Sequence, residues 1–183
     1  MEKLVARVRE DSLGVTGDDD LEPFLSIDKV AICQFAVNAL GYRGGIKRHY
    51  TRERATWFPG GGSRELEGYR AKAAKGEKAW TAEMCIKMGD VLERPPVGEV
   101  TLHLNFARHR NGGDEPYANW AGLSGRSLHT PAEFFPATLS FGGTEASPSG
   151  EAKRVSLPFT QRLGTPDLLL AGPRIKLTAL DGV

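Results

Sequence analysis

The sequence has little of what disulfide-rich, membrane and nucleic-acid-binding proteins require. It contains only two cysteines, Cys33 and Cys85, too few for a disulfide framework. No apolar run approaches the roughly 20 residues of a membrane helix, and no basic segment followed by an apolar one opens the chain as in a signal peptide. The 24 Lys and Arg nearly balance the 23 Asp and Glu, for a formal net charge of +1. We therefore expect neither a nucleic acid nor a membrane as partner.

Motifs of catalytic chemistry are equally scarce. The histidines are scattered, without the HxH or HExxH spacing of metal sites. They are His49, His103, His109 and His129. There is no P-loop or GxSxG pattern, and Ser124 in GLSGR lacks the spacing of a nucleophile elbow. A hydrolase would need a carboxylate pair such as Glu22 and Glu83, so we predict no enzyme and keep a glycoside hydrolase-associated catalytic protein as the lesser alternative.

Turn residues and alternating segments are abundant. With 22 Gly and 11 Pro, turns are frequent and long helices are unexpected. Short segments that alternate apolar and polar residues predict an all-β fold, a β-sandwich of antiparallel strands with distorted jelly-roll or immunoglobulin-like layers. The strands are expected at 3–10, 21–26, 31–38, 69–75, 78–87, 99–108 and 136–141.

The segments between these strands set the expected organisation. Pro23 predicts that the 21–26 strand is an edge or carries a bulge. The basic, Gly-rich segment 41–65 is predicted to run over the surface, and 109–134 to be a long loop. We expect one domain over 1–141 that lacks its first strands, followed by a linker and tail over 142–183.

One predicted sheet face is unusually rich in amides and acids. It collects Arg7, Glu22, Gln34, Asn38, Thr81, Glu83, His103 and Asn105. Such side chains make planar, bidentate hydrogen bonds to sugar hydroxyls, whereas aromatic rings stack on the apolar faces of pyranoses. A wet outer sheet face is the plainer alternative.

Aromatic residues are predicted in the loops. Trp57 and Trp120 are the candidate stacking residues, with Tyr50 and Tyr117 also in loops, whereas Trp80 is expected to pack in the core. A lid over the core edge is the plainer alternative for Trp120, because a loop tryptophan more often packs there than binds a ligand.

Acidic residues gather at Asp18, Asp19 and Asp20, followed by Glu22. Ca²⁺ takes several oxygen ligands from such loops, although the EF-hand spacing is absent. A structural Ca²⁺ and a solvated turn both remain open.

A series of motifs in order carries a family resemblance: GDDDLEPFLS, CQFAVNALG, KAWTAEMCIK, LHLNFARHR, EPYANW and SLHTPAEFFPATLSF. Over about residues 4–141 they resemble the family 9 carbohydrate-binding modules and their DOMON-like relatives. The resemblance implies a β-sandwich that binds oligo- or polysaccharide without catalysis, outside the cell or in the periplasm, often beside other modules of a secreted protein. It also implies structural Ca²⁺ in many members.

The resemblance places a hydroxyl-bonding acid at Glu22 and a structural Trp at Trp120. The two tryptophans that grip a terminal sugar in the family correspond here to Thr16 and to Leu128, next to His129. We therefore expect a different ligand mode. Its candidate binding residues are Glu22, Gln34, Asn38, Trp57, Glu83, Asn105, Trp120 and His129. An interaction module that has lost sugar binding is the alternative.

Overall fold

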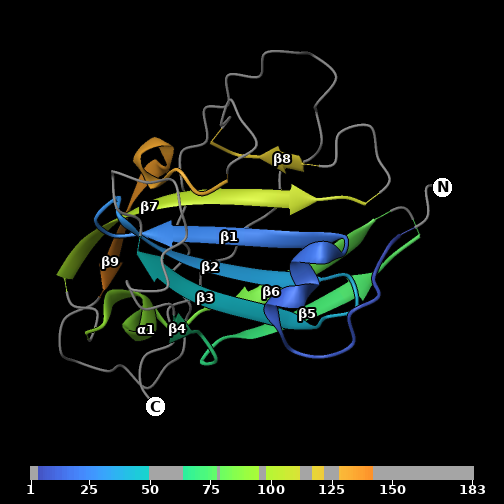
Figure 1. Cartoon of the computed structure of the whole chain (residues 1–183). Helices are drawn as coiled ribbons and strands as arrows, with labels where there is room; N and C mark the ends of the chain where they lie inside the picture. The colour runs from blue at the N-terminus through green and yellow to red at the C-terminus, as the bar shows by residue number, and fades with distance from the viewer. Residues whose placement is uncertain are drawn as a thin grey trace.

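Antiparallel strands build nearly all of the regular structure (Figure 1). The computed structural model describes residues 4–49, 64–77, 79–94, 98–111, 117–121 and 128–141. The strands are β1 (Asp20–Ser26), β2 (Ala31–Asn38), β3 (Arg43–His49), β4 (Arg64–Glu65), β5 (Arg70–Lys75), β6 (Trp80–Cys85), β7 (Gly98–His109), β8 (Tyr117–Asn119) and β9 (Phe135–Phe141). The described helices are short: η1 (Leu13–Gly17), α1 (Met88–Leu92) and η2 (Pro131–Glu133). The all-β fold class is confirmed.

Two sheets form the two layers. Seven strands make the large sheet in the order β4-β3-β2-β1-β7-β8, with β9 also paired to β7, and β5 and β6 form a separate two-stranded hairpin. The main hydrophobic core fills the space between one face of the large sheet, the hairpin and α1. Its most buried members include Cys33, Phe35, Val91 and Leu102. The finer assignment to a jelly roll or immunoglobulin-like topology stays a prediction.

The opposite face of the large sheet is also covered. Phe24 and Ile32 pack there with Ala107, Leu128 and Phe134 into a second core cluster. Segment 128–134 thus lies across the middle of the sheet. Consequently, β1 and β2 are buried on both faces.

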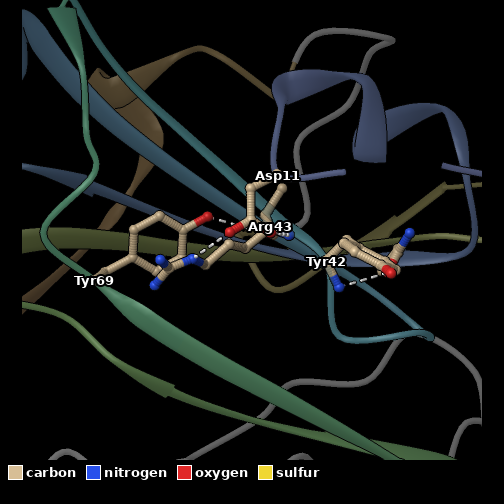
Figure 2. A network of polar contacts seen from close by, with 6 residues as sticks. Asp11, Tyr42, Arg43 and Tyr69 are labelled. Carbon is tan, nitrogen blue, oxygen red and sulfur yellow. Dashed lines mark hydrogen bonds and ion pairs between the residues drawn. The ribbon is translucent and has the colours of Figure 1, made fainter. Parts of the chain in front are cut away.

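Polar contacts tie the layers and the N-terminal segment together (Figure 2). Arg43 pairs with Asp11 at 3.2 Å and lies over the Tyr69 ring, 5.2 Å from its centroid. The Tyr69 hydroxyl donates to the Ala36 carbonyl at 3.0 Å, which anchors the chain entering β5 to β2. At the other end, buried Lys47 of β3 bonds Glu93, just after α1, at 2.8 Å.

Most predicted strands are confirmed, namely those at 31–38, 69–75, 78–87, 99–108 and 136–141. The prediction that Pro23 marks an edge or bulge is wrong, because β1 pairs with both β2 and β7. The β1–β2 ladder joins Asp20, Leu21, Phe24 and Leu25 to their partners and passes over Pro23, whose missing N–H is tolerated there.

The strand predicted at 3–10 is also wrong. Residues 4–9 form no strand, because aspartate carboxylates take their backbone N–H groups. Asp18 accepts from Arg7 and Val8 at 2.9 Å, and Asp19 accepts from Val5 at 3.0 Å.

The segment 41–65, predicted as a surface excursion, contains β3 and β4. Glycines within β3 let neighbouring chain approach closely: the Tyr69 ring and Leu66 pack on Gly45, and the Ser12 backbone lies on Gly44. β8 and η2 likewise lie inside the predicted 109–134 loop, and α1 lies inside the predicted connection 89–98.

We predict that Gly44→Ala destabilises the fold by about 1–3 kcal/mol, the usual cost of overpacking. An added Cβ would overlap the Ser12 carbonyl and lie 2.6 Å from the Leu13 nitrogen, and these are backbone atoms that cannot rotate away. Urea unfolding measures the change. Gly17→Ala is the matched control, since a Cβ at Gly17 meets nothing within 4 Å. Equal midpoints for the two variants would contradict the packing described here.

Candidate functional site

The polar residues predicted to share a face do so on β1, β2 and β7. The register pairs Phe24 with both Gln34 and Asn105, and Asp20 with Asn38. Glu22 lies on the same face, two residues from each of these β1 positions. We call this surface the polar face. Three residues predicted on this face lie elsewhere: Glu83 and Thr81 are exposed on β6 in the other sheet, opposite Lys72 and Ala74, and Arg7 is exposed and belongs to no strand.

Two segments cover the polar face: 128–134 packs over the part around Phe24 and Gln34, and the N-terminal segment bonds Asn38 at the other end. Glu22 is 5% exposed and Gln34 7%, whereas Asn38 and Asn105 are fully buried. A chain of hydrogen bonds runs through the face: Gln34 Nε2 donates to Glu22 Oε2 at 2.5 Å, and Gln34 Oε1 lies 3.3 Å from Nε2 of His129. The His129 ring packs edge-on against Phe24 at 5.3 Å. The polar face is therefore an interior layer, not an open platform.

Asn38 has its hydrogen-bonding capacity filled by the protein. Its Nδ2 donates to the Val8 carbonyl and to Asp18, both at 2.9 Å. Its Oδ1 accepts from the backbone N–H groups of Leu40 and Tyr42. These four bonds join the N-terminal segment to the turn after β2, and no donor or acceptor remains for a ligand.

Burial perturbs the ionisable groups of the polar face. Burial, and after it the nearby charge of Glu22, raises the pKa of Asp20 to about 9, and the His109 backbone offsets part of this rise. Neither carboxylate oxygen of Asp20 has a hydrogen-bond partner among the described residues. Burial likewise raises the pKa of Glu22 to about 7, against the lowering effect of the Gln34 bond. Burial, then the Arg48 charge, lowers the pKa of His129 to about 4. At neutral pH Asp20 is thus protonated and His129 neutral.

Further buried polar atoms on this face have no hydrogen-bond partner among the described residues. They are Ser26 Oγ, His103 Nδ1 and Asn105 Nδ2. Asn105 does use its oxygen, which accepts from the Ala121 N–H at 2.9 Å. This unused capacity suits hydroxyl groups chemically, but these atoms are shielded from solvent.

The expected Ca²⁺ loop does not present its acids to a cation. In the described ranges no group of three or more acidic, His or Cys side chains could hold a metal ion. Asp18 and Asp19 instead bind backbone N–H groups, Asp19 reaching that of Asn111 at 2.6 Å. Structural Ca²⁺ stays a prediction, and the described residues do not fit it.

A partly exposed aromatic cluster lies at the margin of the main core, where β8 and β9 follow one another along the same side of β7. Trp120 bonds the Phe106 carbonyl at 2.8 Å, which continues the β8 register, and Phe135 opens β9 opposite Leu104. The Trp120 ring lies 5.4 Å from that of Phe106 and 5.1 Å from that of Phe135. Phe135 is 45% exposed, and the other two rings are half-buried. We call these three residues the aromatic edge.

A cationic side chain lies beside the aromatic edge. Arg108 follows Phe106 by two residues on β7, so both side chains leave the same face of the sheet. Arg108 is half-buried, and its Nε has no hydrogen-bond partner within the described part of the chain. Sequence analysis missed Arg108 and Phe135. The sequence shows that Arg108 alternates with Phe106 and that Phe135 alternates with Leu139. It does not show that β8 and β9 pair in succession with the same strand, β7.

The remaining aromatic candidates from the sequence are Trp57, Tyr50 and Trp80. Trp57 and Tyr50 lie outside the described residues. Trp80 is half-buried at the start of β6, in the hairpin.

Comparison with known proteins finds a solved structure with a similar fold. No protein-family model and no curated protein matches the sequence. The chain is similar to a crystal structure of a "putative carbohydrate-binding protein" from Bacteroides uniformis, with a TM-score of 0.53 and 18% identity over 76% of this chain and 68% of that one. At this identity the likeness shows a shared fold.

No helix in the described ranges is long and apolar enough to span a membrane.

The buried acids predict an unusual pH dependence of stability. Folding raises the pKa of Asp20 from 3.8 to about 9, so the folded state holds the proton more tightly and the free energy of unfolding falls as pH rises through this window. Glu22 acts likewise, but only up to about pH 7. Urea midpoints should therefore decline between pH 7 and pH 9, and Asp20→Asn should remove most of that decline.

Glu67→Gln serves as the control, because Glu67 is exposed. It should leave the decline unchanged. His129 works in the opposite sense, losing stability only as pH falls from 6.5 towards 4, so it does not interfere in this range. A midpoint that rises from pH 7 to pH 9 in the unsubstituted protein would contradict the burial of a protonated Asp20.

Proposed function

We propose that this protein is a noncatalytic carbohydrate-binding domain whose glycan lies against the aromatic edge. The observation that carries the proposal is the contact of the half-buried Phe106 and Trp120 rings with the exposed Phe135, with Arg108 on the same face. Aromatic rings take the apolar C–H faces of a pyranose, and a guanidinium donates to its oxygens in a planar fork.

The proposed affinity is weak, near millimolar. The family that the sequence resembles grips sugar between two tryptophans, whereas the positions here are Thr16 and Leu128. Each aromatic contact contributes about 0.5–1.5 kcal/mol beyond burial. A single open platform on one side of the sugar therefore holds it less tightly than a grip on both.

The similarity to a "putative carbohydrate-binding protein" supports the proposal through the fold alone. The resemblance to family 9 modules supports it through sequence motifs. On this proposal the domain acts as an accessory to polysaccharide recognition or breakdown, outside the cell or in the periplasm, where such polymers occur.

A catalytic role has less support. Asp20 and Glu22 do retain protons near neutral pH, as a general acid must. However, Asp20 is fully buried and Glu22 is 5% exposed. Neither carboxyl group can reach a glycosidic bond of a polymer in this arrangement.

We predict that Phe135→Ala and Trp120→Ala each weaken oligosaccharide binding by about tenfold, because each removes one ring of the stacking surface. Isothermal titration with xylo-, cello- and manno-oligosaccharides measures the affinity.

Leu40→Ala is the matched control. It also removes an exposed large apolar side chain, 43% accessible, but from the turn after β2. It should titrate like the unsubstituted protein. Absence of heat with every sugar from folded protein rules out binding of those ligands and favours the interaction module. Equal affinities for Phe135→Ala and the unsubstituted protein would place the sugar elsewhere.

A further inference from the structure

We infer that the glycan bound at the aromatic edge is acidic, and that Arg108 receives the carboxylate of a uronic acid residue. This inference rests on the proposed function and deepens it, because it names the class of sugar. The observation behind it is an arginine that makes no ion pair among the described residues and follows one of the clustered rings by two positions on the same strand face.

The residues paired with Arg108 across the strand ladders are neutral. Across the two ladders it is paired with Leu21 of β1 and Ala118 of β8. The ion pairs seen among the described residues involve Arg43 with Asp11 and Lys47 with Glu93, and Arg108 makes none. Its Nε is shielded from solvent and has no hydrogen bond within the described ranges.

The Nε of this guanidinium is unsatisfied among the described residues. A buried N–H has lost its hydration, and here it gains no acceptor from the described part of the chain in return. Arg43 shows the contrast, since its Nε lies 3.2 Å from Asp11 and its guanidinium lies over the Tyr69 ring. A ligand carboxylate would give Arg108 the negatively charged hydrogen-bond acceptor that Asp11 gives Arg43.

The position relative to the rings selects a sugar acid. Residues two apart on a strand lie about 7 Å from one another, with side chains on the same face. A pyranose stacked on the aromatic edge can therefore direct a carboxylate carried on its own ring towards Arg108. The planar fork of a guanidinium matches a planar carboxylate with two parallel bonds, which favours a uronate over a sulfate ester.

The test compares two ligands that differ only at the carboxyl group. These are xylotriose carrying one glucuronic acid, and the same oligosaccharide with that carboxyl reduced to an alcohol. Titration of the full chain should give about tenfold tighter binding of the acidic form, since hydrogen bonds to charged groups are the stronger ones. Raising the NaCl concentration from 50 to 500 mM should shrink this preference.

Three variants assign the preference to one side chain. Arg108→Gln should bind both forms equally, and Arg108→Lys should recover only part of the preference because the point charge lacks the fork. Arg94→Gln, an equal loss of charge at an exposed position after α1, should keep the full preference.

The outcomes separate the two proposals. Equal binding of both forms by the unsubstituted protein overturns the uronate inference while carbohydrate binding stands. No binding of either form or of neutral oligosaccharides overturns the proposed function. Tighter binding of a sulfated xylo-oligosaccharide than of the uronate overturns the choice of carboxylate, and a preference that survives in Arg108→Gln overturns the role of Arg108.

Discussion

The burial of β1 and β2 on both faces is the constraint on which the rest of the structure depends. One face packs on the hairpin and α1, and the other packs beneath Leu128 and Phe134. Strands covered on both sides cannot present an open sheet surface, whatever polar residues they carry. Exposed side chains of the large sheet must then lie towards its margins, and the β7 margin is where three aromatic rings gather.

The amides and acids of the polar face consequently serve the fold first. Glu22, Gln34 and His129 form one continuous chain of contacts, and Asn38 fills all four of its bonds with protein atoms. Buried polar groups of this kind are costly unless they are paired, so they favour one register of the strands over others. A one-residue slip of β2 would turn Asn38 and Gln34 into the apolar core.

The three consecutive aspartates Asp18, Asp19 and Asp20 have different structural roles. Asp18 and Asp19 end the loop before β1, where they bind the backbone of residues 5–8 and replace the ladder that a strand would need. Asp20 already belongs to β1 and points into the polar face. An acid-rich loop therefore has a structural explanation that needs no cation.

Alternation along the chain predicted most strands and, on β1, β2 and β7, also which residues share a face. That part depends on local chemistry, because successive side chains in a strand point to opposite sides. It did not predict that Pro23 lies in a central strand, since the order of strands follows from pairing across long stretches of sequence. Alternation also failed to predict β3, because the glycines at 44 and 45 suggested a turn. In the structure they lie within a strand and leave room for Ser12 and Tyr69.

The candidate site was harder to predict for the same reason. Trp120 stands out in the sequence as a loop tryptophan, but a stacking surface requires its neighbours. Phe106 belongs to the middle of β7, and Phe135 begins a strand 15 residues after Trp120. The three rings meet only because β8 and β9 pair in succession with the same long strand, leaving a junction between them opposite Phe106.

The junction between β8 and β9 also explains why the aromatic edge, rather than the polar face, is the better candidate for a binding surface. The polar face offers more hydrogen-bonding groups, yet reaching them requires displacing Leu128 and Phe134 from a packed cluster, at a cost set by the apolar area re-exposed. The aromatic edge requires no such rearrangement, since Phe135 is already 45% exposed. A weak ligand cannot supply the free energy to open a core, so a sugar that binds near millimolar must use the surface that is open in the free protein.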